Sequence, residues 1–469
     1  MVFSSITFLF YFLPIVLLSY YIVPKKMKNI VLLIASLLFY FWGEPKNILI
    51  MISMIGFSYI GGLLIDRLRE KKSKLLKLTL FLTIVIDLSS LFYFKYIDFL
   101  IRNINLYLEQ KIDLIGVILP IGISFFTFQI ISYLIDVYRG DAKVQKNVFK
   151  LALYVSLFPQ LIAGPIVRYK DVAKQIDDRT HTVQKFSNGI RRFVIGLSKK
   201  VLVANILGEL VSVFSTSSDS TIVFYWLYAV ANMLQIYFDF SGYSDMAIGL
   251  GKMFGFEFLE NFNYPYIATS ITDFWRRWHM SLSSWFKDYV YIPLGGNRKG
   301  LKRQIINIFI VWFLTGLWHG ANWNFILWGV YFGIILLIEK VVLLNVLEKT
   351  PKVLNRIYVL FIVLISFILF SNEDLNIAFQ NIKGLFVSDV GVISNVSSYY
   401  LLSYIVTILI AIIGSTPLLK NIINKLSSKN EKLKMIINVL EPVILTTFFV
   451  VSVSYIIDGS FNPFLYFRF

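Results

Sequence analysis

Histidine is the side chain best suited to proton transfer near pH 7, and the sequence contains three histidines. His319 lies in the stretch LTGLWHGANW, with apolar segments on both sides. An ionisable residue in such a place is costly and therefore a candidate for function. A neutral imidazole there could deprotonate a hydroxyl as a general base. The structural alternative is a core histidine that bonds to a backbone carbonyl.

The second histidine, His279, lies in a stretch whose apolar residues recur at helical spacing from Ile271 to Leu282. This pattern predicts one amphipathic helix at a membrane surface. On that helix His279 shares the apolar stripe with Trp275, so it could be a second catalytic residue or an interfacial anchor. Arg276 could bind lipid phosphate or an anionic donor. We expect His181, in a polar loop, to be solvated and without a role.

Two further segments carry polar or aromatic groups that could matter. Asp239 and Asp245 are six residues apart and do not share a helical face, so they do not predict a paired acid–base site. We expect them at the end of a span, with a break at Gly242. The C-terminal segment 458–469 is aromatic, and its first nine residues, up to Tyr466, could extend ~30 Å, about the thickness of the hydrocarbon core. Tyr466 could thus enter an external cavity or serve as an interfacial anchor.

The elements that would position these residues are membrane helices. The chain of 469 residues is 57% hydrophobic, and long runs lack charge. A helical span needs about 20 apolar residues, so the sequence predicts an all-α polytopic membrane protein. Twelve spans are expected, near residues 3–23, 30–43, 46–65, 78–98, 115–136, 200–217, 222–244, 304–319, 322–339, 355–371, 397–419 and 435–457.

The charge pattern and the lack of cysteine exclude several classes of function. The net charge is +17, and the basic residues lie in alternate loops between apolar runs. This pattern is typical of cytoplasmic loops, predicts that both termini are extracytoplasmic, and argues against nucleic-acid binding. The sequence has no cysteine, which excludes a thiol nucleophile, a disulfide and a zinc thiolate site. We expect no metal and no tightly bound cofactor.

Two apolar segments, 151–167 and 285–296, contain Pro and Gly and fit poorly as simple spans. We predict that both are re-entrant, because irregular backbone at that depth must be covered by protein or line a wet cavity. The expected organisation is a transmembrane domain over 1–457 and an extracytoplasmic tail over 458–469. No convincing internal repeat is found, which weighs against common transporter architectures.

Several motifs, in this order, resemble the membrane-bound O-acyltransferase superfamily, and most closely its alginate O-acetylation branch. The resemblance covers nearly the whole chain. Its motifs lie at Phe3–Ser5, Leu119–Phe126, Leu161–Arg168, Asp239–Asp245, Asp273–His279, Tyr291–Gly296 and Trp318–Gly320.

The resemblance implies a ring of helices around a central funnel and tunnel, with His319 as the catalytic histidine and His279 as the second implicated histidine. The tail around Tyr466 resembles a motif whose tyrosine is a proposed acyl carrier in teichoic-acid D-alanylation systems, and a phenol is a workable carrier when a base is near. We assign substrate contacts to Trp318, Asn322, Trp275 and Arg276.

The expected activity is transfer of an acyl group, in our reading acetyl from acetyl-CoA, across a bacterial plasma membrane. Family members that modify polysaccharides pass it to an extracytoplasmic SGNH-hydrolase-like acyltransferase, beside the exopolysaccharide synthesis machinery. One alternative is D-alanyl transfer to teichoic acid. An alternative of another class is a transporter or a lipid scramblase.

Overall fold

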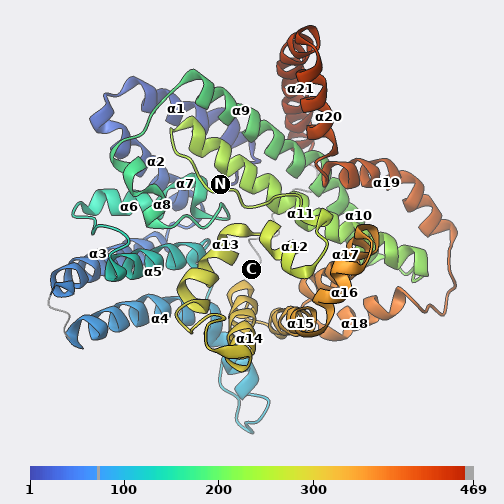
Figure 1. The fold of residues 1–469 in the computed structure, drawn as a ribbon, viewed down its shortest axis with the longest axis horizontal. Helices are drawn as coiled ribbons and strands as arrows, with labels where there is room; N and C mark the ends of the chain where they lie inside the picture. The colour runs from blue at the N-terminus through green and yellow to red at the C-terminus, as the bar shows by residue number, and fades with distance from the viewer. Residues whose placement is uncertain (71–73, 460–469) are drawn as a thin grey trace. The chain divides into compact units, whose positions relative to one another are not determined.

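A computed structural model describes residues 1–70 and 74–459 of the chain (Figure 1). These residues form helices joined by turns and loops, and none of them forms a strand. The predicted all-α class is therefore confirmed. The chain falls into two compact units, the first made of Met1–Phe193 with Met246–Leu259 and the second of Val194–Asp245 with the residues from Glu260 onward.

Seven helical segments of the described chain are long and apolar enough to cross a membrane, which confirms a polytopic membrane protein. These segments are Lys25–Gly43, Ile48–Arg69, Lys74–Ile104, Trp323–Lys349, Lys352–Ser371, Asn395–Gly414 and Glu431–Ile457. The predicted number of twelve stays a prediction. The expected span at 115–136 is wrong at its start, because α5 begins only at Ile123, after Pro120 and a left-handed Gly122 (φ 76°).

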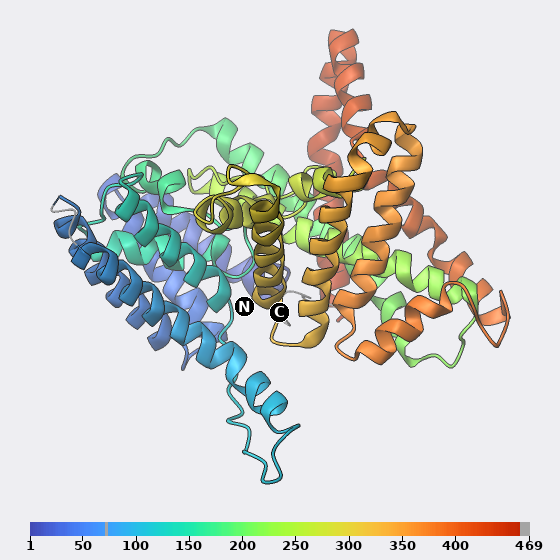
Figure 2. The same cartoon turned by 60° about the horizontal axis from the view of Figure 1, so that its bottom comes forward.

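The first unit contains α1 to α8 and most of α9, and its long helices lie side by side (Figure 2). Their bounds are α1 Leu13–Ile22, α2 Lys28–Gly43, α3 Ile48–Arg69, α4 Lys74–Ile104, α5 Ile123–Arg139, α6 Val148–Ser156, α7 Phe158–Leu161, α8 Tyr169–Asp177 and α9 Val183–Ser198. Small residues set the spacing: a Cβ on Gly61 would collide with Thr83, and one on Gly62 would collide with the Tyr133 ring. Close packing of this kind is typical of membrane helices.

The segment predicted to be re-entrant at 151–167 is a broken helix in the first unit. The Asn147 side chain caps α6 by accepting a hydrogen bond from the Phe149 amide at 2.9 Å. The chain breaks at Leu157, where ψ is 108°, and α7 follows at once. Nearly every residue of the segment is buried. Protein thus covers the irregular backbone as expected, and a path into the membrane stays a prediction.

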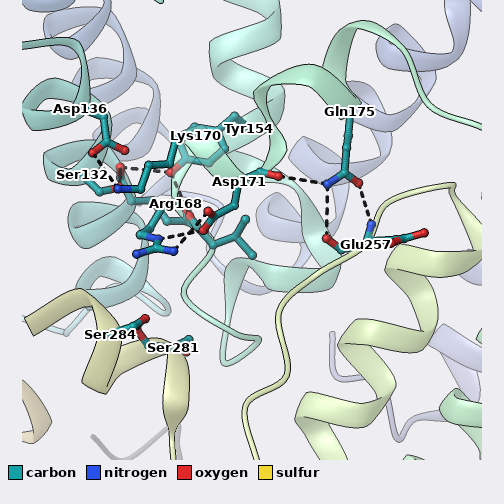
Figure 3. Close-up of polar contacts among 12 residues, drawn as sticks. Ser132, Asp136, Tyr154, Arg168, Lys170, Asp171, Gln175, Glu257, Ser281 and Ser284 are labelled. Carbon is teal, nitrogen blue, oxygen red and sulfur yellow. Dashed lines mark hydrogen bonds and ion pairs between the residues drawn. The ribbon is translucent and has the colours of Figure 1, made fainter. Parts of the chain in front are cut away.

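Polar contacts tie the loops of the first unit together (Figure 3). Lys170 lies 3.7 Å from the buried carboxylate of Asp136, and Arg168 pairs with Asp171 at 2.8 Å. The side-chain oxygen Oε1 of Gln175 accepts a hydrogen bond from the Glu257 backbone N–H at 2.7 Å. The basic stretch after α7 is therefore folded against its own unit.

His181 lies in a loop, as predicted, but it is half-buried and has a hydrogen-bond partner, so the prediction that it is solvated is wrong. Its expected lack of a role stays a prediction. Its Nε2 lies 2.8 Å from the Tyr20 hydroxyl, which also accepts a hydrogen bond from Arg179 Nε at 2.9 Å. Partial burial, together with the charges of Lys28 and Arg179, lowers the pKa of His181 to about 4. The imidazole is therefore neutral at physiological pH.

The second unit contains α10 to α21 apart from the end of α11. The bounds are α10 Ile206–Thr216, α11 Ile222–Met253, α12 Ile271–Arg277, α13 Met280–Phe286, α14 Gly300–His319, α15 Trp323–Ile338, α16 Leu344–Lys349, α17 Lys352–Ser371, α18 Leu375–Gly384, α19 Asn395–Gly414, α20 Leu418–Lys429 and α21 Glu431–Ile457. Helix α14 packs against α15, α15 against α17, and α20 against α21.

Helix α11 runs without interruption through Gly242, so the predicted break there is wrong. The glycine serves close packing instead: a Cβ at Gly242 would lie 2.7 Å from the carbonyl oxygen of Gly196. This approach brings the two lysines of the π-helix Lys199–Asn205 beside α11. Lys200 pairs with Asp239 and Lys199 with Asp245, each at 2.7 Å.

Candidate active site

His319 is the last residue of α14 and is 3% exposed. Its ring lies against three aromatic rings, with centroid distances of 5.0 Å to Trp318, 5.0 Å to Trp328 and 5.2 Å to Phe370. These rings come from α14, α15 and α17. An imidazole enclosed in this way is shielded from bulk water, which suits the transfer of a group that water would otherwise intercept.

The local sequence explains why His319 lies at the tip of a rigid helix pair. Gly320 is extended (φ −169°) and ends α14, and the Asn322 side chain starts α15 by accepting a hydrogen bond from the Trp323 amide at 2.6 Å. One turn before the end of α14, a Cβ on Gly316 would collide with the carbonyl oxygen of Phe325 in α15. The two helices therefore touch through their backbones.

His279 lies at a break in what the sequence predicts to be one helix, so that part of the prediction is wrong. Helix α12 ends at Arg277, and His279 adopts the left-handed conformation (φ 44°, ψ 52°) as the N-cap of α13. Such a conformation is uncommon for a residue with a side chain. The side chain is fully buried, with the Phe240 ring at 4.7 Å, and burial lowers its pKa.

The structure brings both predicted catalytic histidines to the same tryptophan within the second unit. The Trp318 ring lies 5.0 Å from His319 and 5.9 Å from His279 between centroids. Trp275 joins through Trp328, whose ring is 5.7 Å away. We call these residues, together with three neighbouring rings, the aromatic cluster: Trp275, Trp312, Trp318, Trp328, Phe332, Phe370, His279 and His319.

The other predicted site residues have different surroundings. Arg276 is exposed, whereas its neighbour Arg277 pairs with Asp273 at 3.0 Å. The Asn322 oxygen is engaged as the cap of α15. Tyr466 lies outside the described residues. The roles of these residues stay predictions.

Two buried polar residues that sequence reasoning missed support this site. Glu339, 0% exposed at the end of α15, accepts hydrogen bonds from the backbone N–H groups of Ile271 and Thr272 at 2.6 and 2.8 Å. It thereby holds the start of α12. Asn261 contacts His279 directly, as described below. A lone acid after the long apolar run 323–338 was the available signal for Glu339, but no spacing rule linked Asn261 to His279.

A pocket of about 480 Å³ lies beyond α13 in the same unit. Its lining includes Lys287, Arg298, Lys299 and the backbone of two left-handed glycines, Gly295 and Gly296. This segment is the one predicted to be re-entrant at 285–296; it forms the π-helix Lys287–Tyr291 and a turn, and its path in a membrane stays a prediction. The pocket has the size of a small-molecule site and the charge of an anion site.

The chain is similar in sequence to several known acyl-transferring enzymes. The chain is 44% identical over 390 residues to the probable alginate O-acetylase of Pseudomonas aeruginosa, covering 82% of this chain and 75% of that protein. It is 35% identical over 424 residues to the peptidoglycan O-acetyltransferase of Helicobacter pylori, covering 82% and 80%. It is also 30% identical over 228 residues to the teichoic acid D-alanyltransferase of Bacillus subtilis, covering 46% and 58%.

The family model of membrane-bound O-acyltransferases matches residues 3–378, a range that contains both histidines of the aromatic cluster. A polytopic helical chain, an enclosed histidine and a match of this extent all indicate the same class of enzyme. The chain belongs to the membrane-bound O-acyltransferase family.

Proposed function

We propose that the enzyme transfers acetyl groups from acetyl-CoA through a bacterial plasma membrane for O-acetylation of an extracellular polysaccharide. The names of two probable alginate O-acetylases and a peptidoglycan O-acetyltransferase, to which the chain is similar, support acetyl transfer to a glycan. The observation that carries the proposal is His319, buried among aromatic rings at the tip of α14. An extracytoplasmic SGNH-like acyltransferase would receive the acetyl group, and both chain termini would face that side.

The proposed reaction uses His319 as the base. Its imidazole takes the proton from an acceptor hydroxyl, and the hydroxyl oxygen attacks the thioester carbonyl carbon. The carbon–sulfur bond then breaks, and the leaving thiolate takes the proton back from the imidazolium. The products are an oxygen ester and free CoA thiol, and His319 returns to its neutral form.

Two indole N–H groups of the aromatic cluster could stabilise the negative charge on the carbonyl oxygen. Nε1 of Trp275 and Nε1 of Trp328 are buried, and neither has a hydrogen-bond partner among the residues that the structure describes. Buried donors are usually paired, so each of these N–H groups is free to bind an oxygen of a substrate. A donor aimed at a developing oxyanion is worth about 10²–10³ in rate.

The pocket beyond α13 supports a donor that carries phosphate groups. Its lysines and arginine could pair with the phosphates of CoA. Helix α13 and the π-helix that follows it connect His279 to the wall of the pocket. Together they cover residues 280–291, which is a length of at most ~18 Å at the rise of an α-helix. That reach is comparable to the extended pantetheine arm between the phosphates and the thioester.

Reversing charge in the pocket is expected to weaken donor binding. The double variant Lys287→Glu/Arg298→Glu should raise KM for acetyl-CoA about tenfold or more while kcat changes little, because about 1.4 kcal/mol of charge pairing corresponds to a factor of ten. KM for acetyl-pantetheine, which lacks the phosphates, should be unchanged. Lys420→Glu/Lys425→Glu on exposed α20 is the matched control. Equal effects on both donors would remove the pocket from donor binding.

The tail supplies a second prediction. If Tyr466 carries the acetyl group, Tyr466→Phe should abolish glycan acetylation, because phenylalanine has no oxygen to acylate. Tyr455→Phe on α21 is the matched control, and it should behave as wild type. Mass spectrometry of the wild-type protein incubated with acetyl-CoA should show an acetyl adduct on the tail peptide. Near-normal acetylation by Tyr466→Phe would limit the tail to packing.

The experiment that tests the proposed function is complementation. A strain lacking the gene should lose alkali-labile acetate from its extracellular polysaccharide and regain it with the wild-type gene, but not with His319→Gln. Loss of D-alanyl ester instead of acetate would favour teichoic acid as the acceptor, as in the Bacillus subtilis relative. Unchanged esters of both kinds would contradict acyl transfer and favour a transporter or scramblase.

A further inference from the structure

We propose that Asn261 is a positioning residue that keeps the proton of His279 on Nδ1, so that Nε2 presents a lone pair to a hydrogen-bond donor on a substrate. The inference rests on the proposed function, because it assigns a task to the second histidine of that site. The donor that fits is the amide N–H of a pantetheine arm or the attacking hydroxyl.

The hydrogen bonds around Asn261 fix the orientation of its amide. The atom Oδ1 lies 3.1 Å from His279 Nδ1, 2.9 Å from Ser281 Oγ and 3.3 Å from the Ser281 backbone nitrogen. A backbone N–H can only donate, so the atom that faces it must be the amide oxygen and not the nitrogen. This hydrogen bond therefore distinguishes the amide oxygen of Asn261 from its amide nitrogen, two atoms that are often confused.

The same oxygen fixes the tautomer of His279. An amide oxygen can only accept, so Nδ1 of the imidazole must carry the hydrogen. The Ser281 hydroxyl, 3.5 Å from Nδ1, donates its own hydrogen to the same amide oxygen and is left as an acceptor toward Nδ1. The ring is fully buried, and burial favours its neutral form. In a neutral imidazole with the proton on Nδ1, Nε2 is an acceptor.

That acceptor is the atom left for a substrate. His279 Nε2 is buried and has no hydrogen-bond partner among the described residues. The rings beside the imidazole are Phe240 of α11, at 4.7 Å, and Trp318 of α14, at 5.9 Å, and neither ring titrates. A buried acceptor without a partner costs free energy, which a bound N–H or O–H group would recover. Trp318 also contacts His319, so His279 and the proposed base share one neighbouring ring.

The backbone at His279 is strained, and neighbouring hydrogen bonds hold it in place. His279 has φ 44°, a conformation that costs free energy and persists only where its surroundings enforce it. Asn261 supplies the restraint on the far side of the break, because its carbonyl oxygen also accepts from the Met280 backbone N–H at 3.0 Å. Glu339 holds the start of α12 on the near side. The segment from α12 to α13 is thus fastened on both sides of His279.

The direct test is the tautomer itself. The chain has three histidines, so ¹⁵N-histidine labelling of the full-length protein in lipid nanodiscs gives few ring signals, and His279→Gln identifies those of His279 by subtraction. We expect a neutral ring protonated on Nδ1 in the wild type and a mixed or Nε2-protonated ring in Asn261→Ala. A wild-type ring protonated on Nε2 would overturn the proposal, whether or not the protein transfers acetyl groups.

Kinetics separate positioning from mere stability. Asn261→Ala should lower kcat about 10–100-fold, as loss of a residue that orients a functional histidine does in other sites. Asn261→Asp keeps an acceptor oxygen at Nδ1 but adds charge, so it should retain activity at alkaline pH and shift the acid limb of the pH profile upward. Ser281→Ala is the control, because it removes the hydroxyl that lies 3.5 Å from Nδ1 but keeps the shorter contact of Nδ1 with Asn261. Equal losses in the Ala and Asp variants at every pH would contradict the proposal.

Discussion

His319→Gln is expected to lower acyl transfer about a thousandfold or more, since general-base catalysis contributes 10²–10⁴ and here the base also returns the proton to the leaving thiolate. Glutamine fills a similar volume and keeps polar atoms at the end of α14, so the aromatic cluster should stay packed. The measurement is the initial rate of CoA thiol release by purified protein in nanodiscs.

The matched control is His181→Gln, which changes the same residue type in the loop before α9 and should keep near-normal activity. Thermal unfolding of both variants separates catalytic loss from misfolding. A His319→Gln variant that unfolds like wild type and still transfers acyl groups would make His319 a structural residue.

The second large effect concerns the buried ion pair between Lys200 and Asp239. Lys200 Nζ lies 2.7 Å from Asp239 Oδ1, and the side chains of Lys200 and Asp239 are 3% and 2% exposed. Lys200 also donates to Asn205 Oδ1 at 2.8 Å. Asp239→Leu alone should destabilise the protein by about 3–5 kcal/mol, because it leaves a buried ammonium without its carboxylate.

The double variant Lys200→Met/Asp239→Leu should recover most of that loss, because an apolar pair of similar volume avoids burying any charge. The control is Asp178→Asn. It removes the carboxylate of the ion pair between Lys25 and Asp178, which is 2.6 Å long and whose side chains are 71% and 76% exposed. It should change stability by less than about 1 kcal/mol. Denaturant titration of the detergent-solubilised protein measures all three. If the double variant is as unstable as the single one, the pair has a role beyond charge compensation.

Apolar run length was sufficient to predict where most long helices lie. Runs of about 20 residues with little charge indicate spans whatever the tertiary contacts are, and α3, α17, α19 and α21 all coincide with predicted spans. The same rule failed at 115–122, where the residues are apolar but Pro120 and Gly122 delay the helix. Apolarity reports the environment of a segment, whereas backbone restraints decide where its helix begins.

The candidate site divides in the same way. Its two histidines were accessible to sequence reasoning because ionisable residues in apolar surroundings are rare. The conformation of His279 was not, since a periodic pattern from Ile271 to Leu282 cannot show a left-handed residue that long-range contacts enforce. Asn261 was missed for the same reason: its role depends on a contact across 18 residues of sequence.

Gly242 shows how one residue type can mislead. Glycine in a helical pattern suggests a break, but here it allows the backbone of α11 to approach Gly196. Lys199 and Lys200 thereby reach the two acids of α11. The acids are thus paired with lysines from another segment, and not with each other.

The central claim is that acyl chemistry takes place at His319, and one measurement tests it most directly. Purified protein in nanodiscs is given acetyl-CoA labelled in its acetyl group, and free CoA thiol and labelled oxygen ester are followed together. The account predicts that thiol and ester appear in equal amounts in the wild type and that both are lost in His319→Gln. Ester formation by the variant at the wild-type rate, or intact labelled acetyl-CoA as the sole species in the wild type, would contradict it.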